Sequence, residues 1–258
     1  MKKLWKKIFA KKERTVAQQI RRRTIFSFTV FSLLLFVGYE GWLWLYDQPD
    51  TASGAKKPLR EGLQVNEGIF RKIFSNDHLA KSYPKSAAVK QPKVNGDVGM
   101  SSGFDYMHWR MKLVRKPGDT ISVSLQDILM MPKTEVIFDF KCVEGWSQVT
   151  HWGGVRFSDF AKKYNLDTQT NMQYVGLVTP DKQYYVGIDM PSMMHPQTLL
   201  CYEMNGKFLP LDQGFPLRLI IPVKYGIKHL KRIGTIYFSN ERPADYWAER
   251  GYDYYSGL

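Results

Sequence analysis

The stretch EVIFDFKCVEGWSQVTHW, from Glu135 to Trp152, is the part of the chain around which the rest is organised. Before Cys142, a valine and two phenylalanines alternate with isoleucine, aspartate and lysine, and this period of two predicts a strand. Cys142 continues the alternation in phase with the phenylalanines, so its thiol is expected on the apolar face. A thiol in this setting fits a soft-metal ligand in a partly dry pocket. It also fits a buried core residue, or one half of a disulfide with Cys201.

The basic charge of the chain is concentrated at its N-terminus. The 258 residues carry a formal net charge of +13. Residues 1–23 hold ten Lys or Arg and one Glu, a charge of +9, which leaves +4 for the remainder. A nucleic-acid-binding protein carries its basic charge on the folded domain, so this distribution argues against a nucleic-acid partner.

An apolar segment follows the basic one. Thr24 to Tyr46 is long enough to cross a hydrocarbon core of about 30 Å as a helix, and its one charged residue is Glu40. The preceding arginines place the N-terminus in the cytoplasm, the helix in the inner membrane as a single pass, and the C-terminal domain in the periplasm. A buried helix of a soluble protein is the alternative. Arg21 to Arg23 also fit a twin-arginine (Tat) export signal, and the sequence does not decide whether the anchor is cleaved.

Composition divides the chain into four segments. Residues 1–23 are predicted to be a basic cytoplasmic segment, either an amphipathic helix on the anionic inner leaflet or a solvated tail. A transmembrane helix is predicted over 24–46, followed over 47–91 by a polar linker or strap that contains a short helix at 62–74. Residues 92–258 are predicted to form the folded domain, which has enough apolar residues for one sizeable core.

The folded domain is predicted to be α+β, rich in strands with short helices. Strands are expected over 109–114, 136–142, 172–179, 184–188, 198–204, 207–211, 217–223 and 235–238. Short helices are expected over 124–130, with Ser124 and Asp127 as a loose capping box, and over 157–164, with Ser158 at the start. Asn205-Gly206 is the clearest hairpin signal, because a type I′ turn needs two residues that tolerate positive φ.

The second informative stretch is GFPLRLIIPVKYGIKHLKR, from Gly214 to Arg232. It places Arg218 on an apolar strand and several further cations around a glycine turn, an arrangement that suits a phosphate group. A solvated basic turn is the alternative. The signatures of common hydrolases, zinc proteases, P-loop and dinucleotide-binding enzymes are absent, and the five histidines have no ligand-like spacing. Two cysteines are too few for a disulfide framework or a cysteine-built zinc site.

Both stretches resemble the sulfite oxidase superfamily of molybdopterin-binding proteins, and the resemblance runs from about Trp109 to Trp247. The motifs that carry it are CVEGWS at 142–147, WxG at 152–154, HPxTL at 195–199, MNGKxLP at 204–210 and PLRLxxPxKYGxK at 216–228. Their order and spacing make it specific. The chain is most similar to the bacterial periplasmic branch typified by the methionine sulfoxide reductase catalytic subunit.

The resemblance implies a sulfite-oxidase-like molybdopterin-binding fold and a molybdenum–molybdopterin cofactor, with tungsten as a possible replacement for molybdenum. Cys142 matches the thiolate that ligates the metal, and Glu144 and Trp146 match residues that shape the metal pocket. Thr179, Arg218, His229 and Lys231 match positions where the family contacts the pterin or its phosphate, and Gln213 stands where the reductase branch has asparagine. The other cofactor-binding candidates are Asn95, for an asparagine of the reductase's N-terminal pocket motif, and Lys224 and Lys228 of the basic glycine turn. Because the pterin is inserted in the cytoplasm, the resemblance also implies export of the folded protein and so supports the Tat interpretation.

Departures from the family pattern bear on the activity. Val143 to Gly145 replace the glycine-asparagine-arginine run of the sulfite-oxidising branch, which disfavours sulfite oxidation. His151 and Gln213 replace a proline and an asparagine of the reductase branch. The resulting hypothesis is a membrane-anchored periplasmic oxidoreductase that performs oxygen-atom and two-electron transfer. It is expected to reduce a small-molecule or protein-borne sulfoxide-like substrate with electrons from a membrane haem or quinol subunit.

Two alternatives to this hypothesis remain open from the sequence. The first is a non-catalytic binding module of the cell envelope that retains the fold, and the replacements at His151 and Gln213 motivate it. The second is a cofactor-free envelope protein with a disulfide between Cys142 and Cys201.

Overall fold

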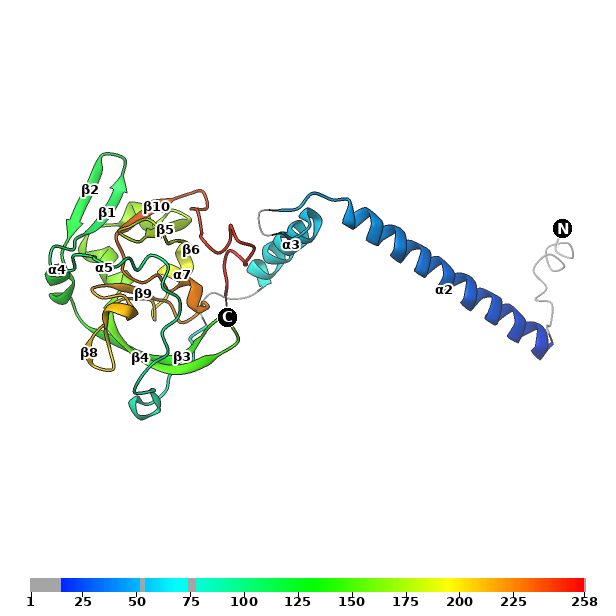
Figure 1. Cartoon of the computed structure of the whole chain (residues 1–258), viewed down its shortest axis with the longest axis horizontal. Helices are drawn as coiled ribbons and strands as arrows, with labels where there is room; N and C mark the ends of the chain where they lie inside the picture. The colour runs from blue at the N-terminus through cyan, green and yellow to red at the C-terminus, as the bar shows by residue number, and fades with distance from the viewer. Residues whose placement is uncertain (1–14, 52–53, 74–77, 258) are drawn as a thin grey trace, which may run out of the picture. The chain divides into compact units, whose positions relative to one another are not determined.

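The computed structural model describes residues 15–51, 54–73 and 78–257, and the chain divides into two units at Gln64 and Val65. In the first unit, α2 runs from Val16 to Tyr46 (Figure 1). A capping box fixes its start, because the Thr15 hydroxyl accepts from Gln18 N and the Gln18 side chain accepts from Thr15 N. The helix thus begins eight residues before the predicted membrane segment. Most of the predicted basic amphipathic segment lies outside the described residues.

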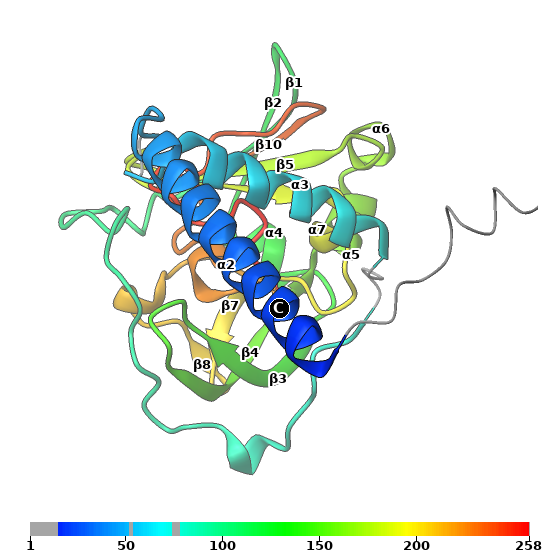
Figure 2. The same ribbon diagram turned by 90° about the vertical axis from the view of Figure 1, so that its right-hand side faces the viewer.

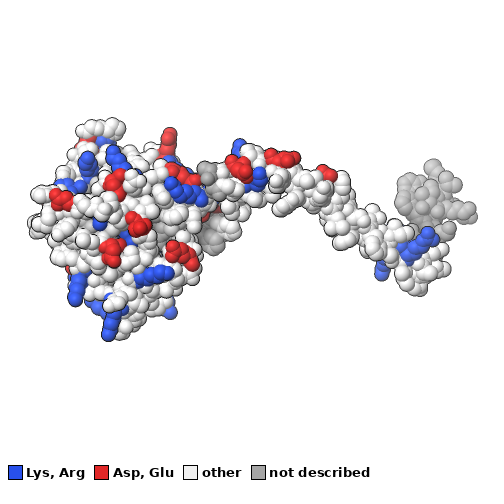
Figure 3. Space-filling view, viewed as in Figure 1, with Lys and Arg blue, Asp and Glu red and all other residues white. Residues whose placement is uncertain are grey.

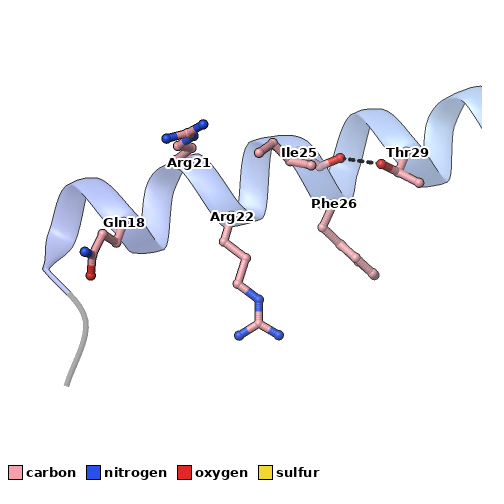
Figure 4. A pocket seen from close by; sticks show the side chains of 6 residues that line it. All are labelled: Gln18, Arg21, Arg22, Ile25, Phe26 and Thr29. Carbon is pink, nitrogen blue, oxygen red and sulfur yellow. Dashed lines mark hydrogen bonds between the residues drawn. The ribbon is translucent and has the colours of Figure 1, made fainter. Parts of the chain in front are cut away.

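α2 is, among the described residues, the one helix long and apolar enough to cross a membrane, a criterion that an N-terminal signal sequence also meets. Its surface is uncharged over much of its length and basic at its N-terminal end (Figure 3). Figure 4 shows the side chains at that end, where Arg21 and Arg22 point outward and Thr29 Oγ1 donates to Ile25 O at 2.9 Å. The shallow hollow between these side chains has walls from a single helix, so it is not a candidate site.

α3 follows from Lys57 to Ile73, five residues earlier than predicted, and a short 3₁₀ helix, η1, covers Lys85–Ala87. The rest of the second unit contains two sheets. The first has the order β2-β1-β10-β5-β6, and the second has the order β3-β4-β7-β8 with β9 paired to β7. Both views place the first sheet on one side of the domain and β3, β4 and β8 on the other (Figures 1 and 2).

The strands of the first sheet are β1 (Met111–Lys116), β2 (Asp119–Val123), β5 (Tyr174–Val178), β6 (Tyr185–Asp189) and β10 (Thr235–Ser239). Those of the second are β3 (Thr134–Lys141), β4 (Ser147–Arg156), β7 (Leu199–Met204), β8 (Lys207–Phe208) and β9 (Arg218–Ile220). β1 and β10 pair in parallel, whereas the other pairs between these strands are antiparallel. The first sheet is therefore mixed and the second is antiparallel, and the predicted α+β class is confirmed.

Short helices connect the strands. They are α4 (Leu125–Leu129), α5 (Phe157–Lys163), α6 (Asp167–Thr170), α7 (Met190–Met193), η2 (Leu211–Gln213) and η3 (Gly226–Lys228). The capping box of Ser124 and Asp127 is confirmed. α5 begins at Phe157, as the predicted range has it, and Ser158 is its second residue; the N-cap is Arg156, which makes no side-chain cap. Asn205 and Gly206 turn with φ of 52° and 73°, which confirms the hairpin.

β3 has the predicted apolar face. Val136, Phe138 and Phe140 are buried and belong to a hydrophobic cluster with Trp152 of β4 and with β7 residues. Cys142 follows in phase and is 6% exposed, so the predicted burial of its thiol is confirmed. β4 can approach β7 closely because a Cβ on Gly154 would lie only 2.3 Å from Leu200 O. The register shifts between Gly153 and Gly154, and Trp152 lies opposite Met204, the last residue of β7.

Candidate cofactor-binding site

Cys142 lies at the base of a tight turn between β3 and β4. Its N–H donates to Trp146 O at 2.9 Å, and its carbonyl accepts from Gly145 N at 3.1 Å. Gly145 has φ of +86°, the left-handed conformation that a three-residue hairpin loop needs at this position. These backbone bonds and the glycine conformation therefore place the thiol at the end of the β3–β4 hairpin.

Glu144 and Trp146 flank the cysteine and are bonded to each other. Trp146 Nε1 donates to Glu144 Oε2 at 2.8 Å, and the indole stacks on Phe140 with ring centres 5.9 Å apart. The Lys93 ammonium lies 4.8 Å from the Trp146 ring centre. Burial, together with the nearby Glu144 carboxylate, raises the pKa of the Cys142 thiol. The thiol is therefore protonated at neutral pH unless a bound cation stabilises the thiolate.

Cys201 is not a disulfide partner of Cys142, because both thiols are free. Cys201 pairs with Gly154 on β4, whereas Lys141, next to Cys142, pairs with Ser147. Seven residues of strand separate these two points, about 23 Å, and a disulfide needs Cα atoms within about 7 Å. The interpretation as a cofactor-free, disulfide-bonded protein was wrong. Cys201 is a fully buried core residue whose pKa is raised by burial to about 12.

Arg218 is a fully buried cation on β9. Its Nη1 donates to the backbone oxygen and to Oε1 of Gln213, both at 2.9 Å, and its guanidinium lies 4.6 Å from the ring centre of Trp152. Its Nε and Nη2 have no hydrogen-bond acceptor. Burial lowers its pKa to about 10. Gln213 thus accepts from Nη1, whereas Nε and Nη2 of the same guanidinium remain without a hydrogen-bond acceptor.

His229 and Lys231 lie in the electrostatic field of Arg218, which lowers the pKa of each in addition to the effect of burial. His229 Nε2 lies 3.1 Å from Lys224 O and therefore carries the proton, since a carbonyl only accepts. Its buried Nδ1 then presents a lone pair without a partner. Lys231 Nζ donates to Gly96 O at 2.8 Å and to Asp212 O at 2.9 Å. Burial lowers the pKa of His229 to about 3, so it stays neutral.

These groups fit an anionic heterocyclic cofactor. Within the described ranges, the buried side-chain nitrogens without a partner are Arg218 Nε and Nη2, His229 Nδ1 and Arg232 Nε. Buried polar atoms are nearly always paired, because an unpaired one costs about 1–3 kcal/mol. Four such atoms between residues 218 and 232 therefore indicate a missing partner with both acceptors and donors. The same described residues hold no cluster of three or more His, Cys, Asp or Glu side chains placed to bind a metal.

Phe140 connects the cysteine turn to this cation cluster. Its ring stacks on Trp146 and meets the His229 ring edge-on, with ring centres 4.8 Å apart. Gly226 packs against it so closely that a Cβ there would lie 2.8 Å from Phe140 Cζ and 3.4 Å from Asn95 Nδ2. The predicted cofactor residues Asn95 and His229 and the cysteine turn thus all lie around Phe140 and Gly226.

Three other predicted cofactor residues are engaged within the protein. Thr179 Oγ1 donates to Asp181 Oδ1 at 2.6 Å. Lys224 Nζ pairs with Asp189 at 2.8 Å, and buried Lys228 forms an ion pair with buried Asp245. The two lysines are thereby neutralised by carboxylates, whereas Arg218 and Lys231 have only neutral acceptors. Their assignment to the cofactor stays a prediction.

Several further residues lie around the site and were not predicted from the sequence. Tyr184 donates its hydroxyl to Ile227 O, and its pKa is raised mainly by burial, with Asp245 and Cys142 nearby. Arg232 was part of the quoted basic stretch, and its positive φ of 51° could not be read from the sequence. No local sequence pattern indicated that Asp189 and Asp245 form ion pairs, because the lysines that they neutralise are 35 and 17 residues away.

The buried ammonium of Lys231 predicts that the cofactor-free protein becomes more stable as the pH rises. Burial, with Arg218 nearby, lowers its pKa from 10.5 to about 7. Between these two values the unfolded chain binds more protons than the folded chain, so the free energy of unfolding increases with pH across this window. Thermal denaturation of the cofactor-free protein is expected to give a higher melting temperature at pH 9 than at pH 7.

Lys231→Met is expected to remove most of this increase, because it removes the titrating group. Lys112→Met on the exposed face of β1 is the matched control and should retain the increase. An unchanged pH dependence in Lys231→Met would show that the buried ammonium is not its source.

Three comparisons relate the chain to known proteins. The family described as oxidoreductase molybdopterin binding domain matches residues 98–247. A protein of Azospira oryzae with the provisional name protein-methionine-sulfoxide reductase subunit YedZ1 is 32% identical over 187 residues, which cover 72% of this chain and 70% of that protein. The protein-methionine-sulfoxide reductase catalytic subunit MsrP of Campylobacter jejuni is 30% identical over 206 residues, which cover 72% and 68%.

A solved structure is also similar to the chain. The sulfane dehydrogenase SoxCD from Paracoccus pantotrophus aligns with a TM-score of 0.48 and 15% sequence identity. The alignment covers 55% of this chain and 40% of that chain.

Proposed function

The chain belongs to the oxidoreductase molybdopterin-binding domain family, the family of sulfite oxidase, and on this premise we propose that it reduces methionine-type sulfoxides at a molybdenum ligated by Cys142. Membership makes the chain a molybdopterin-dependent oxidoreductase and confirms the resemblance found in its motifs. The names of two relatives that match 72% of the chain support the substrate class. The observation that carries the proposal is the set of buried, unpaired nitrogens on Arg218, His229 and Arg232.

The residues of the site provide the groups that the cofactor needs. Cys142 would supply the protein ligand, since a thiolate is a soft donor that suits molybdenum or tungsten. Arg218, Lys231 and Arg232 would donate their remaining N–H groups to anionic oxygens of the cofactor. His229 Nδ1 would accept a hydrogen bond from an N–H of the pterin. When bound, the group supplies a metal centre that exchanges an oxygen atom and two electrons with the substrate.

Glu144 is the proposed proton carrier of the site. Reduction of a sulfoxide consumes two electrons and two protons and releases a sulfide and water, so a proton donor is needed beside the reacting oxygen. The exposed Glu144 carboxylate interacts with the Cys142 thiol and accepts from Trp146, which holds it at the end of the hairpin. In that position it can take protons from solvent and hold them near the substrate.

The proposal includes anchoring in the inner membrane. α2 would cross the bilayer with its arginine-rich end in the cytoplasm, and the catalytic domain would then lie in the periplasm. The electrons would come from a membrane haem or quinol subunit, because the sequence offers no second motif for a redox cofactor. The word subunit in the names of both relatives supports a partner of this kind.

Elemental analysis of the full chain, purified in detergent from a host that makes molybdopterin, tests the cofactor first. About one molybdenum or tungsten and one pterin per chain is expected. The same preparation is then supplied with methionine sulfoxide and a reduced viologen dye, and oxidation of the dye is expected. Cofactor without dye oxidation would overturn the reductase proposal and favour a binding module. Absence of both metal and pterin would overturn the cofactor proposal as well.

A further inference from the structure

α3 has one apolar and one polar half. At 100° per residue, the apolar residues fall within one half of the helical circumference, and they are Pro58, Leu59, Leu63, Val65, Ile69 and Phe70. The other half carries Lys57, Arg60, Glu61, Gln64 and Glu67, and Asn66 is the one polar residue that falls within the apolar half. The side chains of Leu59, Leu63, Val65 and Ile69 are between 49% and 62% exposed. A row of exposed aliphatic side chains of this kind marks a surface that binds another apolar phase.

The polar half of α3 is the half that contacts the catalytic domain. Glu67 forms an ion pair with Arg242, and its side chain is 15% exposed. Both residues belong to the unit Val65–Leu258. The Arg242 guanidinium also lies 5.1 Å from the ring centres of Tyr254 and Tyr255, which hold it in place. Leu59, Leu63, Val65 and Ile69 remain exposed although Glu67 binds the domain.

The chain between α2 and α3 turns back on itself, so the end of α2 lies close to the start of α3. Lys57 N donates to Pro49 O at 2.9 Å, and Lys56 Nζ binds Asp50 Oδ1 and Gln48 O, both at 3.0 Å. Pro49 lies only three residues beyond Tyr46, which limits the first residue of α3 to about 10–13 Å from the end of α2. If α2 crosses a bilayer, α3 therefore starts at its outer surface.

The end of α2 has the composition of a membrane boundary. Trp42, Trp44 and Tyr46 form an aromatic belt of the kind that lies at the level of the lipid headgroups. A helix that starts at this level, with a wide apolar face and a charged opposite face, meets the description of an interfacial helix. A lipid surface is thus the apolar phase that lies within reach of the exposed face of α3.

We propose that α3 lies along the outer surface of the membrane that α2 crosses, with Leu59, Leu63 and Ile69 at the boundary of the acyl chains. This inference rests on the proposed membrane anchoring of α2. The bilayer would cover the apolar half of the helix, and the pair between Glu67 and Arg242 would fix the catalytic domain to its polar half.

The test uses the full chain in vesicles of phosphatidylethanolamine and phosphatidylglycerol, with single cysteines labelled by a polarity-sensitive fluorophore. Leu63→Cys reports the apolar half of α3, and the neighbouring Gln64→Cys is the matched control on the polar half. Both natural cysteines are buried, so the added thiol is the one that reacts in the folded protein. A quencher attached to lipid acyl chains is expected to quench the Leu63 label at least about twofold more strongly than the Gln64 label.

Phe31→Cys in the middle of α2 separates the two proposals. A quenched Phe31 label with equal quenching at positions 63 and 64 would overturn the interfacial helix and leave the anchor intact. A label at position 63 shielded from both the lipid quencher and aqueous iodide would also overturn it, because another protein surface would then cover α3. An unquenched Phe31 label would overturn the anchor and the interfacial helix together.

Discussion

Cys142→Ser is expected to lower sulfoxide reduction by more than about 100-fold, because loss of a ligand should exceed the 10–100-fold typical for loss of a residue that merely supports one. A serine hydroxyl is a hard, neutral donor at pH 7 and does not replace a thiolate on a soft metal. The hairpin itself should persist, since it depends on backbone bonds between Cys142, Gly145 and Trp146. Activity with a reduced viologen dye and circular dichroism of the same preparation measure the two effects.

Cys201→Ala is the matched control for this experiment. It removes the other thiol of the chain, which is buried on β7, opposite Arg218 of β9 and opposite Gly154 of β4, and is therefore distant from the cysteine turn. The variant is expected to lose some stability and to keep its metal and its activity per bound metal. Full activity in Cys142→Ser, or loss of metal in Cys201→Ala alone, would contradict the assignment of Cys142 as the ligand.

Arg218→Met is expected to have opposite effects on cofactor content and on the stability of the cofactor-free protein. Methionine approximates the volume of the arginine stem but cannot donate to an anion, so the pterin content should fall below detection. In the cofactor-free protein the same change removes a buried charge that has no carboxylate partner. Replacing buried charges with apolar groups can stabilise a fold by about 1–4 kcal/mol. Pterin fluorescence and urea denaturation measure the two effects.

Arg115→Met provides the comparison for this variant. Arg115 forms a half-buried ion pair with Asp119 on the β1–β2 hairpin, and such pairs contribute about 0–1 kcal/mol. Its removal should change neither the pterin content nor the stability by much. Normal pterin content in Arg218→Met would show that the unpaired guanidinium does not serve the cofactor.

Strands, caps and turns that depend only on neighbouring residues could be predicted from the sequence. The alternation before Cys142, the capping box at Ser124 and the turn at Asn205 depend on neighbouring residues, and all three are confirmed. β4 was not predicted, because most of it is buried on both faces and therefore shows no alternation. The pair Gly153-Gly154 is also typical of a loop, although Gly154 is needed here for the close approach of β4 to β7.

Gln213, His229 and Lys231 lie near Arg218 in the structure, and their role in holding a cofactor stays a prediction. Their electrostatic states could not be predicted from the sequence. Which cations are free depends on carboxylates that are distant in sequence, because Asp189 and Asp245 neutralise the two lysines of the same turn. A single sequence contains no local pattern for such pairs, so the six basic residues of this stretch looked equivalent until the fold distinguished them.

The parallel pairing of β1 with β10 has a consequence for the order of events in the cell. β10 is the middle strand of its sheet, between β1 and β5, so this sheet is incomplete until Ser239 has been synthesised. At about 5–20 residues per second, the ribosome needs on the order of 10–40 s to proceed from Tyr46 to Ser239. During this interval α2 has already emerged while the nascent domain has no place to hold a pterin. If α2 crosses the membrane as proposed, a delay in its insertion would decide whether the domain receives the pterin while it is still in the cytoplasm.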